Sequence, residues 1–139
     1  MVDPLEALIN LARTDADLSV LTAGRVAAKH LFGDGWGIPA KALQLRADGG
    51  TPDLYTERQL LRVEARCYGE TPAGAMAVYR ELVRLTRQPN RARAETGAGF
   101  AIIYWLVPTS GPSLLQDPET RVDFVLVFLE AAVSEVDIP

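Results

Sequence analysis

The residues that could take part in catalysis or metal binding are few, and they are scattered along the chain. His30 is the single histidine and Cys67 the single cysteine among 139 residues. A zinc site needs several histidines or cysteines, and a thiol on the inward side of a strand is inert. We interpret Cys67 as a small core residue, because it falls on the inward face of a predicted strand. The sequence therefore predicts no metal site, no cofactor and no catalytic residue.

A glycine-rich segment at residues 33–37 has the sequence Gly-Asp-Gly-Trp-Gly. It lacks the Lys-Ser/Thr pair of a phosphate-binding P-loop, and Pro39 and a strand follow where a nucleotide-binding helix should begin. We therefore interpret it as a plain turn. The aspartates lie at predicted caps and turns, where carboxylates bind backbone N–H groups, and they form no acid–base pair; they are Asp15, Asp17, Asp34, Asp48 and Asp53.

A basic cluster follows the middle of the chain, formed by Arg84, Arg87, Arg91 and Arg93. Two interpretations stay open: a solvated face, or a contact with an acidic partner surface or DNA phosphate. The formal net charge of -4 argues against a dedicated nucleic-acid binder, because neutralising phosphates needs a basic surface. We predict no sequence-specific nucleic-acid binding.

Apolar side chains in predicted loops either anchor the loop or mark a contact with another molecule. Together with two of the arginines they make up the candidate interface, which consists of Trp36, Leu54, Tyr55, Arg91, Arg93, Leu114 and Leu115.

The clearest structural pattern lies in residues 57–88. Inward Leu61, Val63, Ala65 and Cys67 alternate with polar residues, as in a strand with one buried face. Gly69 ends the strand, Thr71 caps a helix and Pro72 occupies its first position. The apolar face of this helix is expected to carry Ala75, Tyr79, Leu82, Val83 and Thr86, and Pro89 stops the helix.

The other elements have weaker signals. Asp3 and Pro4 begin a helix, and Thr14 or Asp15 caps a second, short one that Gly24 ends. Residues 26–32 fit either helix or strand. Strands are predicted at 42–47, at 100–107, where apolar residues on both faces indicate a central strand, and at 121–133. Residues 48–57 and 108–120 are predicted loops.

This order of elements predicts a single α+β domain over residues 1–139. We expect a mainly antiparallel four-stranded sheet with a long helix and short N-terminal helices packed on one face. Only the strands before and after the long helix have a connection that permits parallel pairing. The second sheet face is expected to carry Val125, Val127, Ile103 and Trp105, and a neighbouring subunit is a reasonable cover for it. No apolar run has the length of a membrane span, and the acidic N-terminus is unlike a secretory signal, so we expect synthesis in a cytoplasm.

Three stretches of the chain resemble the tail terminator (tail completion, or minor tail) proteins of long-tailed bacteriophages. They are the opening DPLEALINLARTDADLSVLTAGRV, the strand and helix ERQLLRVEARCYGETPAGAMAVYRELVRL, and the final loop and strand LLQDPETRVDFVLVFLEA. The order of the elements and the total length also agree, so the resemblance covers nearly the whole chain. Residues 26–39, with Trp36, depart from the family's pattern.

The resemblance implies a structural protein of the virion, not an enzyme. Members of the family form a hexameric ring on the head-proximal end of the tail tube, where the ring ends tube polymerisation and offers a joining surface to the head. The implied partners are other copies of this chain, the tail tube protein and the head connector or neck protein, with no membrane and no cofactor. Two alternatives remain: a neck or head-completion connector protein, and a small-ligand-binding or enzymatic α+β domain.

Overall fold

The computed structural model of this chain describes residues 3–28, 41–52, 58–87, 92–96, 99–116, 118 and 122–136. Three helices and six strands make up these residues. In chain order they are α1 (Pro4–Thr14), α2 (Ala16–Thr22), β1 (Val26–Ala27), β2 (Ala42–Pro52), β3 (Arg58–Gly69), α3 (Pro72–Thr86), β4 (Ala92–Thr96), β5 (Gly99–Gln116) and β6 (Asp123–Val136).

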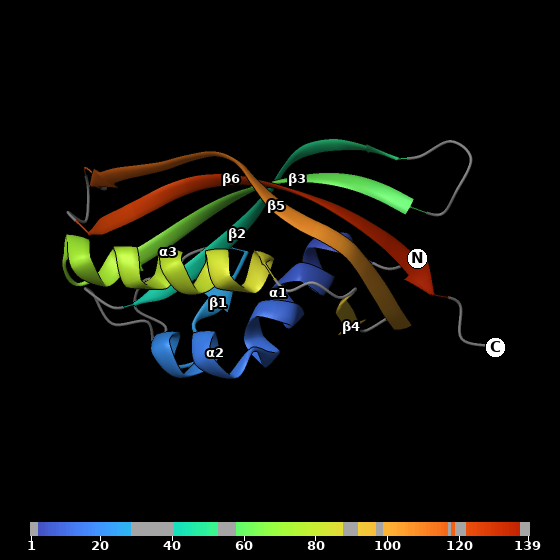
Figure 1. Cartoon of the computed structure of the whole chain (residues 1–139), viewed down its shortest axis with the longest axis horizontal. Helices are drawn as coiled ribbons and strands as arrows, with labels where there is room; N and C mark the ends of the chain where they lie inside the picture. Colours follow the sequence, from blue (N-terminus) through green and yellow to red (C-terminus); the bar gives the residue numbers. More distant parts are fainter. Residues whose placement is uncertain are drawn as a thin grey trace.

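The strands form one sheet in the order β1-β2-β3-β6-β5-β4, and the three helices lie on one face of it (Figure 1). The predicted α+β class and the one-sided packing of helices are therefore confirmed. The predicted sheet of four strands was wrong, because six strands pair and β1 runs parallel to β2. The parallel pairing that the connection through α3 would permit does not occur among the described strands, since β3 pairs antiparallel with β2 and β6. With 15 residues, α3 is also not the long helix that we predicted.

The helix starts follow the predicted capping residues. A side-chain oxygen of Asp3 accepts the N–H of Leu5 at 2.9 Å, and Asp15 accepts the N–H of Leu18 at 3.0 Å. Thr71 does the same for Gly74 at 3.1 Å, with Pro72 next to it in the first turn. Each cap satisfies an N–H that has no partner inside the helix, which fixes where the helix begins.

Gly69 joins β3 to α3, and its lack of a side chain permits a close approach. A Cβ atom at this position would lie 2.2 Å from the backbone nitrogen of Ala75. The first turn of α3 therefore packs directly on the end of β3, which fixes the helix against the sheet.

The main core lies between the helices and the odd-numbered side chains of the two central strands, β3 and β6. Buried residues of α3 complete it: Ala75, Val78, Leu82 and Leu85. Val78 and Leu85 were missing from the predicted helix face, whereas Tyr79, Val83 and Thr86 are only half-buried. The buried stripe of α3 therefore consists of Ala75, Val78, Leu82 and Leu85, which recur at spacings of three and four residues.

Three of the four residues predicted for the second face lie in this core instead. Val125, Val127 and Ile103 are buried with the helices, and only Trp105 points to the opposite face. The register of β5 against β6 shifts between Ile103 and Trp105, so the alternation of faces reverses at that point.

Strand β5 is longer than predicted and lies next to the edge strand β4, not at the centre of the sheet. Its second half contains Pro108 and Pro112, and we predicted a loop there. Both prolines lie at irregularities of the ladder, where the register shifts between Pro108 and Ser110 and between Ser110 and Ser113. Proline is tolerated at bulges and near sheet edges, where its missing N–H breaks no ladder hydrogen bond. In the same way β2 continues through residues 48–52 with a register shift between Ala47 and Gly50.

Candidate interface surfaces

The helix-free face of the sheet exposes large apolar side chains along β5. Trp105, Val107 and Leu115 are 37%, 42% and 43% exposed, and their register partners on β6 are Ala132, Glu130 and Phe124. Paired residues of an antiparallel ladder share a face, so all three side chains belong to the face opposite the helices. We call Trp105, Val107 and Leu115 the β5 patch. Trp105 and Val107 are two residues apart, and Leu115 lies further along the same face, opposite Phe124. Exposed apolar side chains that share one face are a feature of protein contact sites.

The other half of the same face is closed by its own side chains. Tyr68 and Phe124 are buried there with ring centroids 5.5 Å apart, and the Tyr68 hydroxyl donates to Gln44 Oε1 at 3.0 Å. The guanidinium of Arg66 lies 5.1 Å from the centre of the Phe124 ring and binds Glu64 at 2.7 Å. Among the described residues, the large apolar side chains exposed on this face therefore all belong to β5.

Within the described residues, the second half of β5 also has an open edge. Strand β4 pairs with Gly99–Ile103, whereas from Trp105 to Leu115 the described ladder partner is β6 alone. An unpaired strand edge offers N–H and C=O groups to another chain. The β5 patch and this edge thus adjoin each other on one strand.

Of the predicted interface residues, Leu114 and Leu115 lie in β5 and are exposed. They sit on opposite faces: Leu115 pairs with Phe124 on the helix-free face, and Leu114 pairs with core residue Val125 on the α3 side. Arg93 lies in β4 opposite Ile102. Trp36, Leu54, Tyr55 and Arg91 lie outside the described residues, as do His30 and the 33–37 segment. Among the described residues of this set, Leu114 and Leu115 are adjacent in β5 but belong to different surfaces, and Arg93 lies in another strand.

Val107 was missed as an interface residue. The sequence of β5 is apolar on both faces up to this residue, and burial on both faces was the simplest explanation. The same run of apolar residues on both faces also fits a strand next to the sheet edge, with helices on one face and the apolar side chains of its other face exposed.

The predicted basic cluster is divided by the fold. Arg84 binds Glu81 at 2.8 Å, is in contact with Asp15 and lies 3.8 Å from Asp17, so it joins α3 to α2. The hydrogen bond with Glu81 and the nearby carboxylate of Asp15 raise the pKa of Arg84. Arg87 is exposed at the end of the helix. Arg84 therefore joins two helices, and both interpretations, a solvated face and a contact with an acidic partner, stay open for Arg87.

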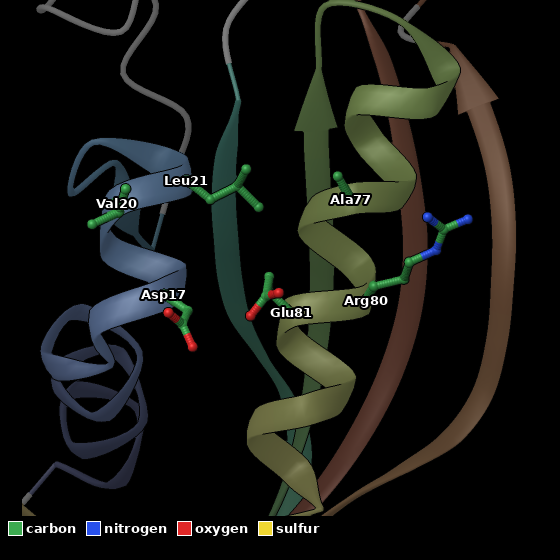
Figure 2. Close-up of a pocket in the computed structure, with 6 residues that line it drawn as sticks. All are labelled: Asp17, Val20, Leu21, Ala77, Arg80 and Glu81. Carbon is green, nitrogen blue, oxygen red and sulfur yellow. The ribbon is translucent and has the colours of Figure 1, made fainter.

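A groove of about 470 Å³ runs between α2 and α3 and is lined by Asp17, Val20, Leu21, Ala77, Arg80 and Glu81 (Figure 2). Leu21 extends toward α3, Glu81 points into the groove and Arg80 points away from α2. Within the described ranges, no three histidine, cysteine or acidic side chains gather as a metal site would require. None of the described helices is long and apolar enough to cross a membrane.

Comparison with known proteins adds a likeness of fold. No family model and no curated protein gives a significant match to this chain. A solved structure described as "Virion of native gene transfer agent (GTA) particle" contains a chain that superposes with a TM-score of 0.60. The match covers 90% of this chain and 90% of that chain at 14% sequence identity. A likeness at this identity establishes a shared fold over nearly the full length of both chains.

Proposed function

We propose that this protein is a structural component of a virion, and that it acts as a tail terminator. In this role, copies of the chain form a homohexameric ring on the head-proximal end of a phage tail tube. The ring ends polymerisation of the tube and offers a joining surface to the head connector. The observation that carries the proposal is the fold shared with a chain of the gene transfer agent virion, over 90% of each chain.

The surfaces of the chain support a role in assembly. A ring of identical subunits needs two different patches on each subunit that fit each other and close by rotation. The β5 patch and the open edge of β5 are apolar and strand-like surfaces of the kind that other subunits or the tube cover. The function requires no cofactor and no catalytic group.

The test is the mass of the purified protein across a wide concentration range, with negative-stain images of the heaviest species. We expect closed six-fold rings, and we expect added protein to cap the ends of preformed tail tubes. A protein that stays monomeric at every concentration, with and without tubes present, would contradict the proposal.

A neck or head-completion connector is the second candidate, because the same likeness of fold concerns a chain of a whole virion. The two roles differ in the partner that is bound first. A terminator binds isolated tail tubes, whereas a head-completion protein binds isolated DNA-filled heads. Sedimentation of the protein with each particle separately therefore distinguishes them.

A further inference from the structure

Helix α3 carries a second groove on its outer surface, with a volume of about 360 Å³. It is lined by Tyr79, Arg80, Val83, Arg84 and Arg87, which we call the arginine groove. Tyr79 and Val83 are half-buried and four residues apart, so they lie on the same side of the helix and form an apolar floor. Arg80, Arg84 and Arg87 follow one another at helical spacing and form a basic rim.

Two of the three arginines in the rim are available for an external partner. Arg84 is occupied by Asp15 and Glu81. Arg80 and Arg87 are exposed, and within the described part of the chain neither has an ion-pair partner. Arginine and tyrosine around an apolar floor are typical of protein contacts with carboxylates. A nucleic acid fits less well, because Asp15, Asp17 and Glu81 surround Arg84 and leave only Arg80 and Arg87 of the rim for a row of phosphates.

Helix α2 carries a surface with the complementary chemistry, an exposed apolar side chain beside a carboxylate. Val20 is 84% exposed and is the most exposed large apolar side chain of the described residues. Asp17 lies one turn before it on the same side of α2, and its side chain is 73% exposed. We call Val20 and Asp17 the α2 knob. It joins an apolar side chain to a carboxylate, as the arginine groove joins an apolar floor to guanidinium groups.

The knob lies on the α2 side of the arginine groove, where Asp17 is 3.8 Å from Arg84, whereas the apolar floor of the groove lies on the far flank of α3. Ala77 and Glu81 of α3 face α2, whereas Tyr79 and Val83 lie on the flank of α3 that faces away from it. Arg80 points away from α2 (Figure 2). A subunit therefore does not bring its own Val20 onto Tyr79 and Val83, but a second copy can. Such a contact is heterologous, and repetition by rotation closes it into a ring.

We propose that the α2 knob of one copy docks in the arginine groove of the next copy. Val20 packs against Tyr79 and Val83, and the Asp17 carboxylate meets Arg80 and Arg87. This inference rests on the proposed ring and names the contact between its subunits. It assigns the β5 patch to other contacts, such as those with the tube.

Charge exchange across the contact provides the test. Val20→Arg places a cation opposite Arg80 and Arg87, and the double substitution Arg80→Glu with Arg87→Glu removes and reverses the basic rim. We expect each variant alone to associate at least about tenfold more weakly than the unaltered protein, which corresponds to about 1.4 kcal/mol. An equimolar mixture of the two variants should recover the rings, because the cation introduced on the knob of one variant meets the carboxylates introduced in the groove of the other.

Two matched controls accompany these variants. Thr14→Arg adds the same cation at an exposed position at the end of α1, outside the groove, and should leave the rings intact. Arg80→Lys with Arg87→Lys keeps the charge and should also leave them intact. Circular dichroism confirms that each variant is folded, which the exposure of the substituted side chains leads us to expect.

The outcomes separate this contact from the proposed function. If the unaltered protein forms rings and the variants form them equally well, the contact is wrong and the terminator function stands. If the single variants fail and their mixture fails as well, complementarity between knob and groove is wrong. If the unaltered protein neither forms rings nor caps tubes, both proposals fall together.

Discussion

The two faces of the sheet are made from alternate residues of the same strands, yet their apolar side chains are buried to different extents. On the helix-covered face, Val125, Val127 and Leu129 of β6 are almost completely buried by the chain's own helices. On the helix-free face, Tyr68 of β3 and Phe124 of β6 are buried against each other, whereas the side chains of the β5 patch are exposed. The strands supply apolar side chains to both faces, but the helices among the described residues cover only one.

This difference separates stability from assembly. Residues of the helix-covered face stabilise the single subunit, because their burial is complete without any partner. Residues of the β5 patch contribute little to the fold while they are exposed, and they gain burial only when another molecule covers them. Substitutions on the two faces should therefore affect different measurements.

The largest difference in stability is expected when a valine on each face is replaced by aspartate. Val127→Asp buries an unpaired carboxylate in the helix-covered core and should lower the free energy of unfolding by at least about 4 kcal/mol. Val107→Asp, at a valine that is exposed in the β5 patch, should change it by less than about 0.5 kcal/mol. Urea unfolding followed by circular dichroism measures both. Equal losses for the two variants would show that the two faces do not differ as described.

The next effect is a pH dependence of the free energy of unfolding, caused by Cys67 on the helix-covered face. Complete burial raises the pKa of the Cys67 thiol above its ordinary value of 9.0. In the unfolded chain the thiol loses its proton as the pH passes that value, whereas in the folded chain it keeps it. The unfolded state then binds fewer protons, so stability falls as the pH rises, by up to about 1.4 kcal/mol per pH unit.

Cys67→Ala removes this dependence. Between about pH 9 and about pH 10, the variant should lose stability less steeply than the unaltered protein. Urea unfolding of both proteins at each pH gives the two slopes, and their difference is independent of the small constant cost of the smaller side chain. Parallel slopes would mean that the Cys67 thiol ionises in the folded protein as readily as in the unfolded chain.

A smaller effect is expected at the closed half of the helix-free face. Tyr68→Phe removes the hydroxyl that donates to Gln44 Oε1 and leaves this buried oxygen without that donor. The free energy of unfolding should fall by about 1 to 2 kcal/mol. Tyr79→Phe, at a half-buried tyrosine of α3, is the matched control and should change it by less than about 0.5 kcal/mol. If both variants are equally stable, the Tyr68–Gln44 hydrogen bond does not stabilise this half of the face.

The sequence predicted the local signals well and the long-range pairing poorly. Capping at Asp3, Asp15 and Thr71, the break at Gly69 and the inward face of β3 all depend on neighbouring residues, and the structure confirms them. The parallel pairing of β1 with β2 is a tertiary contact that periodicity within a strand does not encode.

The candidate interface was predicted only in part, for a related reason. Leu114 and Leu115 were identified as exposed apolar residues, but their proline and glycine neighbours indicated a loop. In the structure the same residues form a strand whose register shifts accommodate Pro108 and Pro112. Val107 and Trp105 then acquire a common face with Leu115, which depends on a shift at Tyr104 that no pattern in the sequence reveals.

The smallest effect on stability, and the most direct test of the β5 patch, comes from the two adjacent leucines. Leu115 lies on the helix-free face, and Leu114 lies on the α3 side, 51% exposed. Leu115→Asp and Leu114→Asp should each change the free energy of unfolding by less than about 1 kcal/mol, because neither side chain is buried. Only Leu115→Asp should weaken binding to tail tubes, measured by sedimentation of the protein with tubes, because only this carboxylate enters the patch that the tube is expected to cover. Equal weakening by both variants would place the contact on the end of the β5–β6 hairpin as a whole, and normal binding by both would remove the β5 patch from the interface.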